Sequence, residues 1–227
     1  NIFEQRIDGE TKNFGTTSGS TAWTFNNLTF SNLNHSATST INTNTGGTGG
    51  VTIGSGAETT LLVSKTGDAL GTTLDAGNRT WTLSSASSAK PFNIDQLNGA
   101  LTASSSTFDF TEDADTGEVT VENPSSYYNL SLGGTAAEGY DPEGDLTITN
   151  DLTVNTNATA TSTDNWTVNG SVTGAGTVTL AGGTFEQDIA EAETFGSSSG
   201  ANNWTFSNLT FNTSRTVAQS ITPNEGT

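Results

Sequence analysis

The acidic side chains of this chain are the residues with the clearest capacity for chemistry. Asp113, Asp115 and Glu118 lie on a short run that contains Gly117. Hard cations such as calcium bind several oxygen ligands on a tight, Gly-containing turn. The run lacks the third Asp or Asn and the distal Glu of an EF-hand loop, so a solvated acidic corner is the alternative. These three residues are the candidate calcium ligands, the acidic residues around the Pro142–Gly144 turn are a similar candidate, and no cofactor is predicted to be required.

Two further acidic groups, within residues 138–145 and 186–193, could supply paired carboxylates. Carboxylates hydrolyse glycosidic bonds when they face each other across a groove, but these lie in turn-like segments. The chain has no Cys, and its single His35 lies in a Ser- and Asn-rich loop. We therefore predict no enzymatic activity, and a polysaccharide-degrading β-helix remains the enzyme alternative.

Asn-x-Ser/Thr sequons are frequent and would accept glycans in an extracellular protein. Because the chain is so rich in Asn, Ser and Thr, the number of sequons does not by itself establish glycosylation. The ten candidates are Asn27, Asn34, Asn78, Asn129, Asn157, Asn165, Asn169, Asn203, Asn208 and Asn212.

The composition narrows the class of protein. The 227 residues carry a net charge of -18, and 44 Thr, 25 Ser, 23 Asn and 26 Gly make up about half of them. With only 6 Lys and Arg residues, we exclude nucleic acid as a partner. No apolar stretch is long enough to cross a membrane as a helix. The chain starts at Asn1 rather than Met, and we expect it to be a segment of a longer protein.

The scarce apolar residues alternate with Thr, as in Trp23-Thr24-Phe25, Val51-Thr52-Ile53 and Val178-Thr179-Leu180. This period of two predicts short strands with one buried face. Gly, Asn, Asp and Ser separate these runs and predict turns. All four Trp residues stand before a Thr and an apolar residue, which favours packing in the core over a carbohydrate platform. The chain is therefore predicted to fold, and to be all-β.

A long repeat organises the chain. Residues 14–30 and 195–211 are identical at eleven of 17 positions when Phe14 is aligned with Phe195, and Trp, Phe and Leu are among the matches. We therefore predict one repeat unit of about 181 residues over 1–184. Residues 185–227 would then begin the next repeat and match residues 3–46.

Shorter intervals predict the architecture. The intervals from Trp23 to Trp81 and from Trp166 to Trp204 are both near multiples of 19 or 20. Together with short strands and Gly-rich turns, this favours a parallel β-helix (β-solenoid) with about 20 residues per coil. Tandem Ig-like β-sandwich modules are the alternative, because they also explain alternation and turns.

Several blocks resemble a known family. Tyr128–Leu132, Gly144–Asn155, Asn165–Gly170 and Gly176–Leu180 follow one another in the order of the Thr/Asn/Gly-rich β-helical repeats of giant microbial surface proteins. The resemblance is best over Tyr127–Asn212. It implies an extracellular, tandemly repeated adhesin, stalk or fibre protein, and it carries no shared catalytic residues.

These observations predict a structural protein of the cell surface, a repeat segment of an extracellular filament that self-assembles by end-to-end stacking of β-coils. Its partners would be copies of itself or adjacent repeats of the same chain. A glycan- or host-binding adhesin module is the alternative function, with surface glycans as partners.

Overall fold

The described part of the chain forms 24 strands and no helix. A computed structural model describes residues 1–34, 36–43, 46–54, 60–65, 67–68, 70–84, 90–95, 98–111, 117–213, 216 and 218–224. No helix that could span a bilayer occurs among these residues. The prediction of an all-β chain is confirmed.

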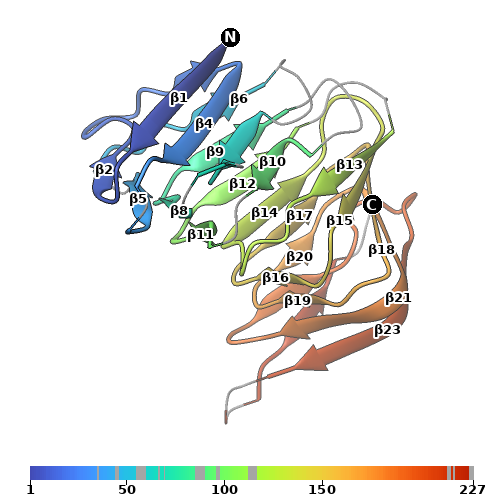
Figure 1. The fold of residues 1–227 in the computed structure, drawn as a ribbon. Helices are drawn as coiled ribbons and strands as arrows, with labels where there is room; N and C mark the ends of the chain where they lie inside the picture. Colours follow the sequence, from blue (N-terminus) through green and yellow to red (C-terminus); the bar gives the residue numbers. More distant parts are fainter. Residues whose placement is uncertain are drawn as a thin grey trace.

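Two sheets of four strands lie in the N-terminal half (Figure 1). The first sheet consists of β1 (Ile2–Ile7), β4 (Asn27–Asn32), β7 (Leu61–Val63) and β10 (Phe92–Ile94). The second sheet consists of β2 (Thr11–Asn13), β5 (Ser39–Asn42), β8 (Thr72–Asp75) and β11 (Ala100–Thr102).

A nine-stranded sheet, here the long sheet, connects the two halves; the row from β6 to β20 in Figure 1 belongs to it. Its strands, in order, are β3 (Trp23–Phe25), β6 (Val51–Ile53), β9 (Thr80–Leu83), β12 (Thr107–Phe110), β14 (Asn129–Leu132), β17 (Leu152–Val154), β20 (Val172–Thr173), β22 (Glu193–Phe195) and β24 (Ile221–Pro223).

The fourth sheet has two wings joined by the twelve-residue strand β21 (Thr177–Asp188). The first wing contains β13 (Glu118–Val121), β15 (Glu138–Pro142), β18 (Ala158–Ser162) and the start of β21. The second wing contains β16 (Leu146–Ile148), β19 (Trp166–Val168) and the end of β21. The last strand, β23 (Trp204–Asn212), pairs with β21 on both sides of a register shift between Leu180 and Thr184, and so extends both wings.

Every strand pairing among the described residues is parallel. Ig-like sandwiches are built from antiparallel sheets, so the alternative of tandem sandwich modules does not fit. In the N-terminal half the chain visits the first, second and long sheets in a constant order. From β15 onward it visits the first wing, the second wing and the long sheet in turn.

The spacing between paired residues is less uniform than predicted. From β12 to β21 it stays close to the predicted value, as in Thr159↔Thr177 and Thr107↔Asn129. In the N-terminal half the spacing is larger, as in Ile2↔Asn27 and Leu28↔Leu61, so the predicted coil of about 20 residues is wrong there. Longer connections between strands add these residues, and the interval from Trp23 to Trp81 spans two steps of the long sheet rather than three.

The core lies along the interior of the stack. Alternate residues of most inner strands are buried, as in β14, where Leu130 and Leu132 are buried and Ser131 between them is half-buried. Because the pairings are in register, inward side chains stack on one another from strand to strand. Trp81 stacks on Phe108 with 6.1 Å between ring centroids and 12° between planes.

The outer face of the long sheet carries a column of hydroxyl side chains. In-register pairing aligns Thr24, Thr52, Thr82, Asp109, Ser131, Thr153 and Thr173 across seven strands. Thr suits this position because its branched side chain favours the extended backbone and its hydroxyl faces water. Because every strand of the stack contributes such an outward position, the folded chain contains many Thr residues and few apolar ones.

Arg79 ties together connections of the N-terminal half from inside the fold. Its side chain is 2% exposed. It donates hydrogen bonds to the backbone carbonyls of Thr43 (2.9 Å, from Nε), Gly49 (2.6 Å, from Nη1) and Thr16 (2.8 Å, from Nη2). Buried carbonyls need donors, and one guanidinium serves two connections that are distant in sequence, the one between β2 and β3 and the one between β5 and β6.

Replacing Arg79 with Met should therefore destabilise the protein. The substitution keeps much of the side-chain length but removes the donors of three carbonyls, and we expect the free energy of unfolding to fall by about 3 kcal/mol. Urea denaturation followed by circular dichroism measures this. Arg6→Met, at an exposed arginine, is the matched control and should change stability by less than about 0.5 kcal/mol. Equal effects of the two substitutions would contradict the role of Arg79.

Candidate functional site

Exposed large apolar side chains gather at the two ends of the stack. Among the described residues they are Ile2, Phe3, Leu33, Leu209 and Phe211. The first three lie on β1 or directly after β4, and the last two lie on β23. Figure 1 shows β1 and β23 at opposite extremes of the molecule. Shallow hollows lie at both ends, one beside Phe3 and one beside Phe211.

The two copies of the sequence repeat explain this exposure. In the first copy Phe3 pairs with Leu28, and in the second copy Phe185 pairs with Leu209, in the same register. Leu28 is fully buried because Leu61 of β7 covers it on the next strand. Leu209 occupies the equivalent position and is 41% exposed, because no described strand pairs with the outer edge of β23. The same holds for Phe30, which is buried beside β7, and Phe211, which is 46% exposed.

The aromatic packing of the first copy recurs in the second. Phe14 lies 5.1 Å from Trp23, 5.8 Å from Phe25 and 5.0 Å from Phe30, measured between ring centroids. The corresponding distances from Phe195 to Trp204, Phe206 and Phe211 are 5.5, 5.8 and 5.0 Å. The interplanar angles also agree within about ten degrees, for example 83° and 86° for the last pair. The sequence repeat is therefore also a repeat of local structure.

A polar contact on the outer face is repeated as well. The Ser31 hydroxyl donates to Glu4 Oε1 at 2.8 Å, and the Asn212 amide donates to Glu186 Oε1 at 3.3 Å. In the first copy Lys65, just beyond β7, lies 3.5 Å from Glu4. The Ser31 hydrogen bond, together with the charges of Lys65 and Arg6, lowers the pKa of Glu4. Within the described residues no cation lies against Glu186, so the C-terminal end lacks both the apolar and the charged partners that β7 and Lys65 supply to the first copy.

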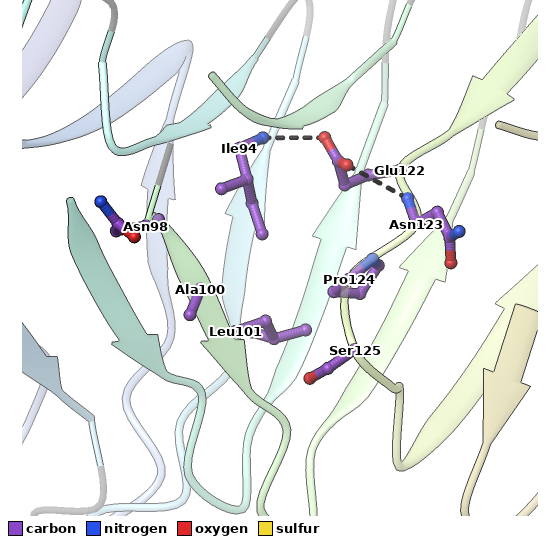
Figure 2. A pocket seen from close by; sticks show the side chains of 9 residues that line it. Ile94, Asn98, Ala100, Leu101, Glu122, Asn123, Pro124 and Ser125 are labelled. Carbon is purple, nitrogen blue, oxygen red and sulfur yellow. Dashed lines mark hydrogen bonds between the residues drawn. The ribbon is translucent and has the colours of Figure 1, made fainter. Parts of the chain in front are cut away.

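A lysine bridges two carboxylates beside a surface pocket of about 330 Å³. Lys90 Nζ lies 2.8 Å from Glu122 and 2.6 Å from Glu143, whose carboxylates follow the neighbouring strands β13 and β15. Glu122 also accepts hydrogen bonds from the backbone N–H of Ile94 (2.8 Å) and of Asn123 (3.2 Å), as Figure 2 shows. Burial lowers the pKa of Lys90, but its hydrogen bonds to the two carboxylates outweigh this and raise it.

This cluster holds strands together, and its arrangement leaves Glu122 little capacity for catalysis. Its carboxylate is already engaged by two backbone donors and one ammonium group. The pocket beside it is lined by Ile94, Leu101 and Pro124 together with small polar residues, and by no aromatic side chain. The sequence analysis missed the cluster, because residues so distant from one another along the chain form no motif.

We predict that Lys90→Met lowers the free energy of unfolding by about 2 kcal/mol, because it leaves the buried Glu122 carboxylate without its cation. Lys12→Met is the matched control. It breaks an exposed ion pair with Glu10, which is worth less than about 1 kcal/mol. Urea denaturation of both variants measures the difference, and an equally small effect at Lys90 would refute the bridging role.

Two of the three predicted calcium ligands lie outside the residues that the structure describes. Asp113 and Asp115 lie outside the described residues, as does His35. Glu118 is exposed at the start of β13, where its carboxylate accepts a hydrogen bond of 3.2 Å from the Thr161 hydroxyl. Among the described residues no group of three or more His, Asp or Glu side chains could hold a metal ion. The calcium site stays a prediction.

Most side chains of the other acidic groups lie along the outside of the stack, but Glu138 at the start of β15 is buried. On the first wing, burial raises the pKa of Asp141, and the negative charges of Glu118 and Asp164 add to this effect. At the C-terminal end Glu186 and Glu193 belong to β21 and β22; Glu193 is half-buried, and Glu186 lies on the outer face. On the first wing the carboxylates of Glu118, Asp141 and Asp164 lie close enough to repel one another.

The sequon candidates divide by exposure. Asn27, Asn34, Asn129 and Asn169 are half-buried. The Asn129 side chain takes part in a ladder, since its amide donates to Thr107 at 3.2 Å and its oxygen accepts from Asn150 at 2.7 Å. A glycan there would break this ladder. The exposed candidates are Asn78, Asn157, Asn165, Asn203, Asn208 and Asn212.

The tryptophans lie mainly in the core, as predicted. Trp81 and Trp166 are fully buried, and Trp23 and Trp204 are partly buried and pack against the core. Trp81 and Trp166 therefore form no exposed platform for a sugar ring.

Asp109 occupies one position of the outer hydroxyl column and is paired with Ser131 on the next strand. The pH dependence of stability tests this placement. Burial raises the pKa of Asp109, which the Ser131 hydroxyl offsets only in part. The folded state therefore binds this proton more tightly than the unfolded state, so stability falls as the pH rises through the two pKa values. We expect Asp109→Asn to raise the thermal midpoint at pH 7, and the gain to vanish below the ordinary aspartate pKa of 3.8.

Thermal melts of wild type and variant at pH 7 and at about pH 3 measure this effect. Asp8→Asn, at an exposed position, is the control and should leave the midpoint nearly unchanged at both pH values. A lower midpoint for Asp109→Asn at pH 7 would contradict the assignment.

No family model, no curated protein and no solved structure matches the chain significantly.

Proposed function

We propose that the parallel sheets wind as a β-solenoid, a parallel β-helix whose coils vary in length between the short step Thr159↔Thr177 and the long step Leu28↔Leu61. The constant order in which the chain visits three sheets, combined with parallel pairing between successive visits, supports a single winding direction. The three sides would be the first sheet followed by the first wing, the second sheet followed by the second wing, and the long sheet.

We further propose that this solenoid is a structural segment of an extracellular surface fibre, stalk or filament that grows along its axis. The observation that carries the proposal is the contrast between Leu28 and Phe30, buried beneath β7, and their exposed equivalents Leu209 and Phe211. A surface that is buried in one copy of a repeat and open in the other fits a further coil on top of it.

The extracellular setting rests on composition and resemblance. A chain with no Cys, a charge of -18 and a surface of Thr, Ser and Asn columns suits a protein exposed to water on all sides. The blocks over Tyr127–Asn212 resemble the repeats of microbial surface proteins that form fibres. The adhesin alternative is less well supported, since Trp81 and Trp166 are buried and the pocket beside Glu122 has no aromatic lining.

Phe211→Asp should impair self-assembly, because it places a charge in the apolar end surface. The measurements are sedimentation velocity over a concentration series and negative-stain electron microscopy. We expect wild type to form end-to-end filaments, and the variant to remain short at the same concentration while keeping its circular dichroism spectrum. Thr205→Asp is the matched control, on the outward face of the same strand, and should assemble like wild type. A wild type that stays monomeric at high concentration would refute the proposal.

A further inference from the structure

We propose that copies of this chain join head to tail with their sides aligned, so that each side of one copy continues into the same side of the next. In this joint β1 of one copy pairs in parallel with Trp204–Phe206, the start of β23, in the preceding copy, and Phe3 lies opposite Trp204. This inference rests on the proposed function and adds the side and the register of the contact. The partner is a second copy of this chain.

The side of the contact follows from the order in which the chain visits the three sides. Its last described strands are the two parts of β23, on the first and then the second wing, and β24 on the long sheet. The next position in this order is the first side, above residues 204–206. A second copy begins with β1 in the first sheet, β2 in the second and β3 in the long sheet. It therefore continues the order when β1 lies above residues 204–206.

Both strands of this contact have an edge to offer. β1 is the terminal strand of the first sheet, and β23 is the terminal strand beyond β21, so each has one edge with no described partner. Unpaired edges of this kind readily take up a further strand, because their N–H and C=O groups are already spaced for a ladder. All described pairings are parallel, and aligned sides make this one parallel too.

The register follows from the second copy of the sequence repeat. Residues 185–187 of β21 are the equivalents of residues 3–5 of β1, although they lie in the second wing rather than in the first sheet. There β19 covers the edge that is open in β1, and Trp166 pairs with Phe185. β19 reads Trp-Thr-Val, and the start of β23 reads Trp-Thr-Phe. The C-terminal end thus carries nearly the same motif that covers the equivalent of β1 inside the fold.

The aromatic side chains at the two ends agree with this register. Phe185 is fully buried, and its ring centroid lies 6.3 Å from that of Trp166. Its equivalent Phe3 is 47% exposed. Trp204 is half-buried at the other end of the stack. The joint would bring Phe3 and Trp204 together as Phe185 and Trp166 already are.

A polar contact of the buried equivalent points to the same register. Gln187 is fully buried, and its side-chain amide donates a hydrogen bond of 2.7 Å to the carbonyl of Gly170, which follows β19. Gln5, the equivalent of Gln187, is half-buried at the open end. In the joint the carbonyl of Asn208 stands where Gly170 stands in the fold, and Gln5 would donate to it.

The long sheet brings apolar residues together across the same joint. β3 of the second copy would lie above β24, whose alternate residues Ile221 and Pro223 are half-buried and exposed. Pro223 pairs with Phe195, which packs against the core. Trp23 and Phe25 of β3 also pack against the core and are only partly buried. Stacking would cover these four residues on a side that is continuous between copies.

On the second side β2 would lie above residues 208–212. Lys12 of β2 pairs with the fully buried Ile41, so its aliphatic part lies on an inward column while its ammonium group is paired with the exposed Glu10. Long cationic side chains cover apolar surface in this way and keep the charge in water. The aliphatic part of Lys12 would cover Leu209 and Phe211.

On the outer face the register sets Thr205 opposite Glu4, as Thr167 lies opposite Glu186 within the fold. The Glu4 carboxylate lies 3.8 Å from Arg6 and 3.5 Å from Lys65. This outward contact therefore tolerates a polar or a charged residue at position 205, and the inward residues carry the joint.

Disulfide cross-linking of full-length chains tests the register, because the chain has no cysteine of its own. Opposite Cα atoms of neighbouring strands lie about 5 Å apart, and a disulfide spans up to about 7 Å. A chain carrying both Glu4→Cys and Thr205→Cys should form a ladder of covalent oligomers when its filaments are mildly oxidised, as non-reducing gel electrophoresis resolves. The matched control carries Glu4→Cys and Thr210→Cys and should be at least ten times less linked. All three positions are exposed.

The outcomes separate this inference from the function on which it rests. Filaments that link through Thr210→Cys instead of Thr205→Cys would place β1 on the second side and overturn the inference alone. Links between two chains that carry only Glu4→Cys would show head-to-head contact, with the same consequence, as would filaments without any link. Wild type that forms no filament would overturn both proposals.

Cryo-electron microscopy of wild-type filaments gives a second readout that needs no variant. The long sheet of one copy should continue into the long sheet of the next, with β24 beneath β3. A long sheet that runs on into a different side of the next copy would refute the joint.

Discussion

The fold depends on one constraint: each strand forms its backbone hydrogen bonds with the strand one layer before and one layer after it. Parallel pairing in register places residues of successive layers directly above one another, at about 4.8 Å. Inward columns are therefore mostly apolar or aromatic, and outward columns are mostly polar, with many hydroxyl groups. A layer at either end satisfies only one of its two edges, and this is why the ends differ chemically from the sides.

This constraint also accounts for the composition. A thin stack needs only two or three inward side chains per strand, as Leu130 and Leu132 of β14 illustrate. The remaining positions need residues that favour extended backbone or tight corners, which Thr, Asn, Gly and Ser provide. Where a connection is long, as in the N-terminal half, a buried polar group secures it. Arg79 does so with three carbonyls, and Lys90 joins the carboxylates that follow two neighbouring strands.

The sequence repeat makes it possible to interpret the exposed C-terminal end. Because Phe185–Leu209 reproduces the register of Phe3–Leu28, the exposed C-terminal surface can be compared with a buried copy of itself. Among the described residues, the comparison identifies apolar contact at Leu209 and Phe211 and a cation at Glu186 as the partners that the second copy of the repeat lacks.

The sequence by itself determined the all-β class, the inward position of Trp81 and Trp166, and the presence of a long repeat, because period-two alternation and aligned aromatics are local signals. It did not determine the coil length of the N-terminal half, since loop length varies freely without disturbing a parallel register. Only the tertiary structure brought Lys90, Glu122 and Glu143 together, and only it placed equivalent strands on different sides of the stack. Contacts between successive layers depend on how many residues each turn consumes, and no spacing in the chain records that number.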